Sequence, residues 1–194
     1  MTSSTLQTLS GSCFCENVQF SIDITNKAQS SIDSETSENS IKTIPENLTL
    51  SAYCHCTNCQ RLNGSPFVWT THWKQESLKW LNSTMIPFKH LEEGISDKLD
   101  IYESMPGRKF KLRCKNCGSP VGSYSIVKKE WTIWGTTLER FKSNEKSAND
   151  STSNIKGWEF IKPDTHIFYG TRILDVVDKL SKWAGYEGES EKLG

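Results

Sequence analysis

Seven cysteines lie in three short clusters whose spacing is typical of metal chelation. These are Cys13 and Cys15, then Cys54, Cys56 and Cys59, and finally Cys114 and Cys117. Thiolate sulfur suits Zn²⁺, which has no redox chemistry of its own, and structural zinc sites take four ligands at about 2.3 Å. A lone cysteine usually packs as a small apolar side chain, but clusters with this spacing indicate metal binding. We therefore expect zinc as the cofactor.

The seven sulfurs can be divided among zinc ions in two ways. One division makes a single ribbon from two C-x-x-C pairs, Cys56, Cys59, Cys114 and Cys117. Its halves lie much further apart than the usual spacing of about 15 to 20 residues. The other makes a closed four-sulfur site, Cys13, Cys15, Cys114 and Cys117, and a three-sulfur site, Cys54, Cys56 and Cys59. This division uses every cysteine, implies two zinc ions per chain, and leaves a coordination position open for water or substrate, as in catalytic zinc sites.

The histidines give no clear proton carrier for such a site. His55 lies between two cysteines, and on a strand its side chain would point away from the metal. We expect His72, His90 and His166 to be structural or surface residues.

Polar residues that follow the second cluster have two interpretations. Arg61, Asn63 and Ser65 belong to the turn-rich run "RLNGSP" and either border the mouth of the site or face water. The run "GRKFKLRCK" (107–115) holds five basic residues. On a strand most of them share one face, which binds an anionic ligand or is simply solvated.

The elements around these clusters have mostly the two-residue period of strands. Val18, Phe20, Ile22 and Ile24 alternate with polar residues, and 48–56 forms another alternating row. Further strands are predicted at 67–73, 109–114, 121–127 and 130–138, separated by Gly, Pro or Asn. Helical spacing occurs in 171–184. The sequence therefore predicts a mainly β protein, built from antiparallel strands, with a short C-terminal helix or turn.

Composition and charge limit the classes of binding partner that we expect for this chain. Lys plus Arg and Asp plus Glu each number 23, so the chain has no net charge to attract nucleic acid, which we do not expect as a partner. The N-terminus lacks the features of a secretory signal, and no run is apolar enough to cross a membrane. We expect a soluble cytoplasmic protein that could also enter the nucleus. In these reducing compartments, short-spaced cysteines bind metal more often than they form disulfides.

Four segments together resemble the glutathione-dependent formaldehyde-activating enzyme family, also known as the Gfa and centromere protein V family. They are "GSCFCENVQFSI" (11–22), "CHCTNCQRLNGSPF" (54–67), "LRCKNCGSPVGSY" (112–124) and "KPDTHIF" (162–168). The resemblance covers a single zinc domain at 11–184, with polar loop insertions near 25–43 and 142–156. Residues 1–10 and 185–194 are then expected to be a flexible N-terminus and a flexible C-terminal tail.

The resemblance implies an Mss4-like fold of several antiparallel sheets with two zinc ions. It implies that Cys13, Cys15, Cys114 and Cys117 hold a structural zinc, and that Cys54, Cys56 and Cys59 hold a catalytic one. The activity it implies is that of a carbon-sulfur lyase, which joins glutathione or another thiol to formaldehyde or another aldehyde and reverses the reaction. The alternative is a non-catalytic, zinc-stabilised module that binds a protein or chromatin partner.

Overall fold

The computed structural model describes residues 8–24, 44–81, 98–141 and 154–194. Its strands are β1 (Thr8–Ser12), β2 (Gln19–Asp23), β3 (Leu48–Cys54), β4 (Val68–Lys74), β5 (Leu78–Trp80), β6 (Leu99–Met105), β7 (Lys109–Cys114), β8 (Pro120–Ser125), β9 (Glu130–Trp134), β10 (Thr165–Ile167) and β11 (Ser181–Lys182). Its α-helices are α1 (Thr57–Asn63) and α2 (Trp158–Ile161), and short 3₁₀ turns are η1 (Gln75–Ser77), η3 (Gly135–Thr137) and η4 (Tyr169–Thr171). The prediction of a mainly β protein is confirmed.

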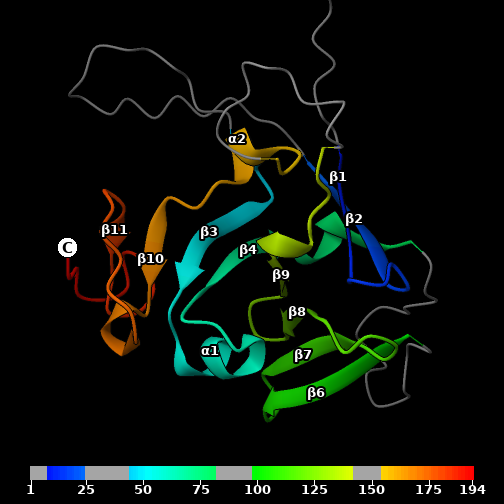
Figure 1. Cartoon of the computed structure of the whole chain (residues 1–194), viewed down its shortest axis with the longest axis horizontal. Coiled ribbons are helices and arrows are strands. Elements are labelled where there is room, and N and C mark those ends of the chain that lie inside the picture. The colour runs from blue at the N-terminus through cyan, green and yellow to red at the C-terminus, as the bar shows by residue number, and fades with distance from the viewer. Residues whose placement is uncertain (1–7, 25–43, 82–97, 142–153) are drawn as a thin grey trace, which may run out of the picture.

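The strands form two sheets. The smaller has the order β1-β2-β5, and the larger runs β11-β10-β3-β4-β9-β8-β7-β6. Figure 1 shows β1 and β2 on the opposite side of the molecule from β10 and β11. Pairing is antiparallel except at one edge of the larger sheet, where β10 runs parallel to both β3 and β11.

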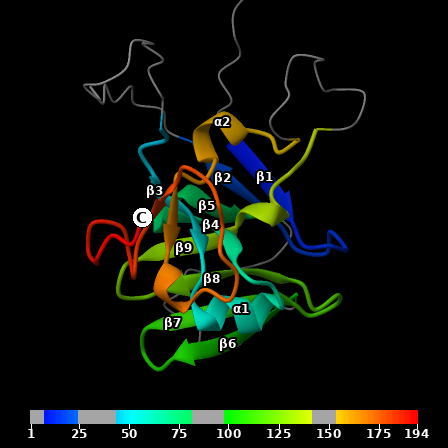
Figure 2. The ribbon, with the colours of Figure 1, turned by 60° about the vertical axis from the view of Figure 1, so that its left-hand side comes forward.

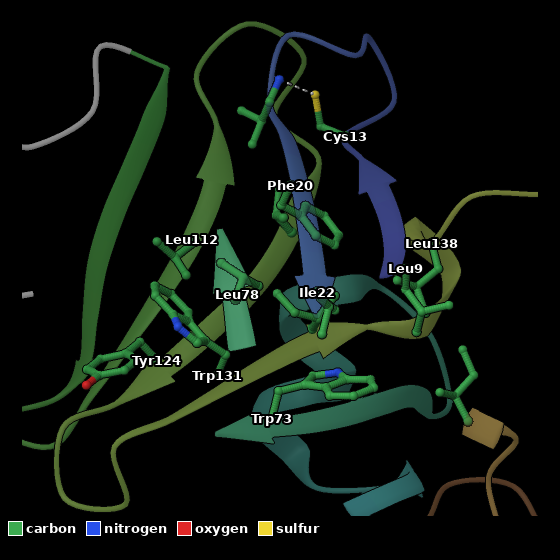
Figure 3. Packing of buried hydrophobic residues seen from close by; sticks show 14 of the residues in the cluster. Leu9, Cys13, Phe20, Ile22, Trp73, Leu78, Leu112, Tyr124, Trp131 and Leu138 are labelled. Atoms are coloured by element: carbon green, nitrogen blue, oxygen red, sulfur yellow. Dashed lines mark hydrogen bonds between the residues drawn. The ribbon is translucent and has the colours of Figure 1, made fainter. Parts of the chain in front are cut away.

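The main core joins the two sheets, and the alternation of apolar residues explains which face each strand buries. Phe20 and Ile22 of β2 are fully buried, as is Trp73 of β4. Figure 3 shows these side chains gathered with Leu112 of β7, while Cys13 lies at the margin of the cluster. Burial of such large side chains contributes about 1.5–3 kcal/mol each, so this cluster dominates the apolar contribution to stability.

The helix predicted at 171–184 is wrong. The segment forms only the end of η4 and the short strand β11, and Ile173 and Val177, two of its apolar residues, are 71% and 100% exposed. A short isolated helix is marginal unless its apolar face packs against something, and these residues have no such surface. The segment is instead held by polar contacts, including the Val176 N–H that donates to the Tyr169 hydroxyl at 2.8 Å.

Two predictions about the cysteine segments also need correction. The C-x-C pairs do not lie within strands, since β1 ends at Ser12 and β3 ends at Cys54. The stretch after the second cluster is not a loop throughout, because Thr57–Asn63 forms α1. Its sequence explains the boundaries. The Cys56 sulfur caps the first turn, and Gly64 ends the helix with a left-handed backbone at φ 60°.

The polar insertion at 25–43 and most of the one at 142–156 lie outside the described residues, so their assignment as loops stays a prediction. The expected tail at 185–194 makes local bonds, because the Gly185 N–H donates to the Ser190 hydroxyl at 2.8 Å and Trp183 bridges to Lys192. Its flexibility stays a prediction. In the described part of the chain, no helix has both the length and the apolar character needed to cross a membrane.

Candidate metal centres

Four cysteine sulfurs meet where two tight turns face each other. Cys13 and Cys15 belong to the turn between β1 and β2, whereas Cys114 is the last residue of β7 and Cys117 lies in the turn between β7 and β8. Gly118 follows with φ 72°, a left-handed conformation that glycine adopts without steric cost. The cluster therefore connects the smaller sheet to the far part of the larger one.

The spacing of these four sulfurs fits one zinc ion. All four lie within 4.8 Å of one another, and the Cys13–Cys15 and Cys15–Cys114 sulfur pairs are 3.6 and 3.8 Å apart. A tetrahedron with Zn–S bonds of about 2.3 Å has S···S edges of about 3.8 Å. This donor set is the one that structural zinc prefers.

Hydrogen bonds are directed at the same sulfurs. The Val18 N–H donates to Cys13 Sγ at 3.3 Å, and the Asn116 side-chain amide donates to Cys15 Sγ at 3.2 Å. Burial raises the pKa of Cys13 to about 12, whereas the bond to Ser119 lowers the pKa of Cys117 to about 6 and the Asn116 bond lowers the pKa of Cys15. The surroundings of Cys15 and Cys117 therefore favour the thiolate form, which is the form that binds a metal.

The second cluster is built from a strand end and a helix start. Cys54 is the last residue of β3, Cys56 is the N-cap of α1, and Cys59 lies in the first turn of that helix. Their sulfurs lie within 4.8 Å of one another, and the Cys59 N–H donates to Cys56 Sγ at 3.3 Å. Among the described residues this group has three members, so the two clusters separate as the second division of the cysteines predicted.

The three sulfurs are close enough to share a charge. Hydrogen bonding from Cys54 and Cys59 holds the pKa of Cys56 well below its usual value, with a further contribution from Lys111. The same contacts, together with burial, hold the pKa of Cys54 well above its usual value. The three sulfurs, all within 4.8 Å of one another, converge on a common point where a divalent cation can replace the thiol protons. The donor set fits zinc.

A cavity of about 150 Å³ adjoins this cluster and is lined by all three cysteines. Trp134, Ile167 and Phe168 form an apolar part of its wall. Phe168 has φ 55°, which is rare for a bulky residue, and its ring packs edge-on against Tyr186 with centroids 5.0 Å apart. Tyr186 also lines the cavity, so the C-terminal segment contributes to this site.

The lining includes residues that the sequence did not assign to the site. They are Lys109, Lys111, His72, Thr132 and Tyr186. By contrast, Arg61, Asn63 and Ser65 do not line it, because they lie on α1 and the turn after it, and Asn63 instead donates to the Cys59 carbonyl at 2.9 Å. His90 lies outside the described residues. The strand alternation that places His72 on the same face as Thr70 was visible in the sequence, but the facing cavity was not.

His72 forms a buried pair with Glu130. Its Nδ1 lies 2.7 Å from Glu130 Oε1, and Thr49 donates to the other carboxylate oxygen at 2.7 Å. Burial lowers the pKa of His72, although the bond to Glu130 opposes this shift. Burial would raise the pKa of Glu130, but the bond to His72 holds it below its usual value. Because an ionised carboxylate only accepts, the His72 Nδ1–H donates and Nε2 keeps its lone pair.

A hydrogen-bonded chain lies behind the three-cysteine cluster. His166 Nε2 is 2.8 Å from Asp178 Oδ2, and His166 Nδ1 is 2.8 Å from His55 Nε2. The carboxylate requires the donor at His166 Nε2, which makes His166 Nδ1 an acceptor for His55. Both imidazoles are fully buried, and burial lowers the pKa of His55 to about 4. His55 therefore stays neutral and anchors the segment between Cys54 and Cys56 through its bond to His166, although it lies just beyond the end of β3 rather than on a strand.

Comparison with known proteins points to one family. A family model described as "Glutathione-dependent formaldehyde-activating enzyme" matches residues 39–170, which include the whole three-cysteine cluster and Cys114 and Cys117. No curated protein matches the chain significantly. A crystal structure of a Rhodobacter sphaeroides protein from a structural genomics programme aligns with a TM-score of 0.41 and 14% identity, over 70% of this chain and 92% of that one.

Proposed function

Since the chain belongs to the glutathione-dependent formaldehyde-activating enzyme family, we propose that it is a zinc-dependent carbon-sulfur lyase acting on the adduct of a thiol and an aldehyde. The observation that carries this proposal is the convergence of Cys54, Cys56 and Cys59 on the wall of a cavity. A purely structural zinc site has four protein ligands and no need of an adjoining cavity.

The two clusters would have different roles. Cys13, Cys15, Cys114 and Cys117 would hold a structural zinc, and Cys54, Cys56 and Cys59 a catalytic one. A zinc ion held by three thiolates supplies a soft Lewis acid that favours a sulfur ligand. The chain's own residues would hold the thiol and the aldehyde together in the cavity, where proximity replaces a bimolecular encounter.

The reaction itself is an addition and its reverse. In the forward direction the thiol loses its proton, the sulfur electron pair forms the S–C bond, and the π pair of the carbonyl moves to oxygen, which takes up a proton. The reverse breaks the S–C bond and restores the carbonyl. Trp134, Ile167 and Phe168 would exclude water from this space, and thus favour thiol over water as the nucleophile.

His72 is our candidate for the proton carrier. It lines the same cavity, and its Nδ1–H is engaged by Glu130 at 2.7 Å. The remaining nitrogen, Nε2, is the lone-pair atom of a neutral imidazole, since burial lowers the pKa of His72. Such a nitrogen can take the proton of the thiol and return it to the alkoxide oxygen.

The test is NMR exchange spectroscopy of formaldehyde plus glutathione, with and without the zinc-loaded protein. We expect the protein to accelerate exchange between glutathione and its hydroxymethyl adduct, and expect Cys56→Ser to abolish the acceleration while the protein stays folded. Arg61→Ala is the matched control, because Arg61 lies on the same helix but does not line the cavity. A wild-type protein that leaves the exchange rate unchanged would contradict the proposal for glutathione and favour a non-catalytic binding module.

A further inference from the structure

Two lysines of β7 face the three-cysteine cavity. Lys109 and Lys111 are two residues apart, so they share one face of the strand, and both line the cavity together with Cys56 and Cys59. The basic run at 107–115 is therefore not a uniform stripe. Arg113 on the same strand follows an irregularity in the β7–β8 pairing, does not line the cavity and pairs with Asp100 at 3.1 Å.

The lysines approach the cavity from a different wall than Cys54. In the larger sheet β7 is separated from β3 by β4, β9 and β8, yet residues of β3, β4, β9 and β7 line one cavity. The sheet therefore curves around it. Figure 2 shows α1, which carries Cys59, beside β7 and β6, and the charge of Lys111 acts on both Cys56 and Cys59. A ligand whose sulfur lies at the cysteines would thus have the ammonium groups within reach.

Within the described residues, neither ammonium group forms an ion pair with a carboxylate. The Lys111 Nζ lies 5.3 Å from the centroid of the Trp134 ring. The charges of Cys59 and Cys54, followed by that of Glu130, act on Lys109. Glu130 has one oxygen bonded to His72 and the other to Thr49. Burial, followed by the charge of Lys111, lowers the pKa of Lys109. Two half-buried cations that line one cavity provide a site for an anion.

The size of the cavity limits what that anion can be attached to. A volume of about 150 Å³ lies below the roughly 300–1,000 Å³ of ordinary small-molecule pockets. A thiol that fits inside must therefore be short. Glutathione could place only part of its length there.

We propose that Lys109 and Lys111 form an anion subsite that selects compact thiols carrying a carboxylate. The cysteine cluster receives the sulfur, and the lysines bind the carboxylate by charge-assisted hydrogen bonds. This inference rests on the proposed function only in treating the thiol as a substrate. The binding preference itself can be measured without any aldehyde.

The experiment compares two thiols of equal length that differ in charge. 3-Mercaptopropionate and its neutral amide are titrated into the full-length, zinc-loaded protein by calorimetry, with zinc content measured before and after. We expect the acid to bind about tenfold to a hundredfold more tightly, the range of charge-assisted hydrogen bonds. Equal affinities for the two thiols in the wild-type protein would overturn the proposal without reference to any variant.

Variants then identify the residues responsible. In Lys109→Met/Lys111→Met the affinity for the acid should fall to that for the amide, while the amide affinity stays unchanged. Arg113→Met, which removes the same charge from an exposed position of the same strand, should leave both affinities as in the wild type. If the double variant loses affinity for both thiols equally, the lysines only offset the charge of the cysteines and the proposal is overturned.

The outcomes separate this proposal from the lyase proposal. Preference for the acid, lost in the double variant, supports the anion subsite even if formaldehyde exchange is not accelerated. Acceleration of exchange without any preference for the acid supports the lyase and overturns the subsite.

Discussion

The two cysteine clusters present the same kind of ligand in different settings. The four-sulfur cluster lies where the β1–β2 turn of the smaller sheet meets the end of β7 and the β7–β8 turn of the larger one, and Cys13 and Cys114 are part of the main core. The three-sulfur cluster joins a strand end to a helix start, packs in a second, smaller apolar group, and opens on a cavity with two lysines. Position in the fold therefore suggests the role of each cluster, since one ties elements together and the other borders space for a ligand.

The largest effect on stability is expected from the four-sulfur cluster. Cys114→Ser removes a fully buried ligand, and loss of a structural metal should lower the free energy of unfolding by about 3–5 kcal/mol or more. Urea unfolding and zinc analysis measure this. A variant that keeps both its stability and its zinc would break the contrast between the clusters.

The three-sulfur cluster should show the reverse pattern. Cys56→Ser should reduce lyase turnover by about a thousandfold or more, because the group that holds the reacting sulfur is lost. The midpoint of urea unfolding of this variant should stay close to that of the wild type, since Cys56 is only partly buried and lies at the N-cap of α1. A loss of stability as large as that of Cys114→Ser would show that both sites are structural.

An intermediate effect is expected from the chain behind the three-sulfur cluster. His166→Phe keeps the ring volume but leaves His55 without its partner, which should lower the free energy of unfolding by about 2 kcal/mol. Asp178→Asn retains an acceptor for His166 and should cost less. Urea unfolding distinguishes the two, and equal stability of both variants with the wild type would contradict a supporting role for the chain.

The smallest effect concerns pH. Burial lowers the pKa of His72 in the folded protein, so the unfolded chain binds a proton more readily below its ordinary pKa of about 6.5. Stability is then fully present above that value and decreases as the pH falls towards the folded pKa. Burial also lowers the pKa of His55, to about 4, so it contributes in the same window.

The variant His72→Gln should therefore reduce the dependence of stability on pH without removing it. Glutamine can still donate to Glu130, so the hydrogen bond at this position is conserved. The measurement is the unfolding midpoint between pH 7.5 and 5.5 for the wild type and the variant. Identical slopes would show that His72 does not titrate as its burial implies.

The sequence was informative where the signal was local. Alternation of apolar residues identified the strands around Phe20, Leu50 and Leu112, and the short spacing of the cysteines identified the two groups that could hold metal ions. The division of the sulfurs required only a count of how many each ion takes. The helical periodicity at 171–184 predicted a helix that does not form. The spacing of apolar residues does not show whether another part of the protein covers them, and Val177 is fully exposed.

The cavity could not be predicted from the sequence, because its walls come from distant segments. Lys109 and His72 face the same space only because the larger sheet curves, and Tyr186 reaches it from the C-terminal segment. The bonded His55 and His166 are likewise far apart in the chain and meet through the parallel pairing of β10 with β3. Side-chain roles that depend on such pairings become visible only once the strand order is known.

That parallel pairing also sets an order in which the two sites can be completed during synthesis on the ribosome. All four sulfurs of the first cluster are available once Cys117 has emerged, but Cys54 gains its neighbour Ile167 much later, and the cavity gains Tyr186 later still. Because chains emerge from the N-terminus and begin to fold during synthesis, we expect nascent protein to pass through a stage with one finished site. At that stage Cys54, Cys56 and Cys59 are less shielded from oxidants and competing metals than in the finished protein.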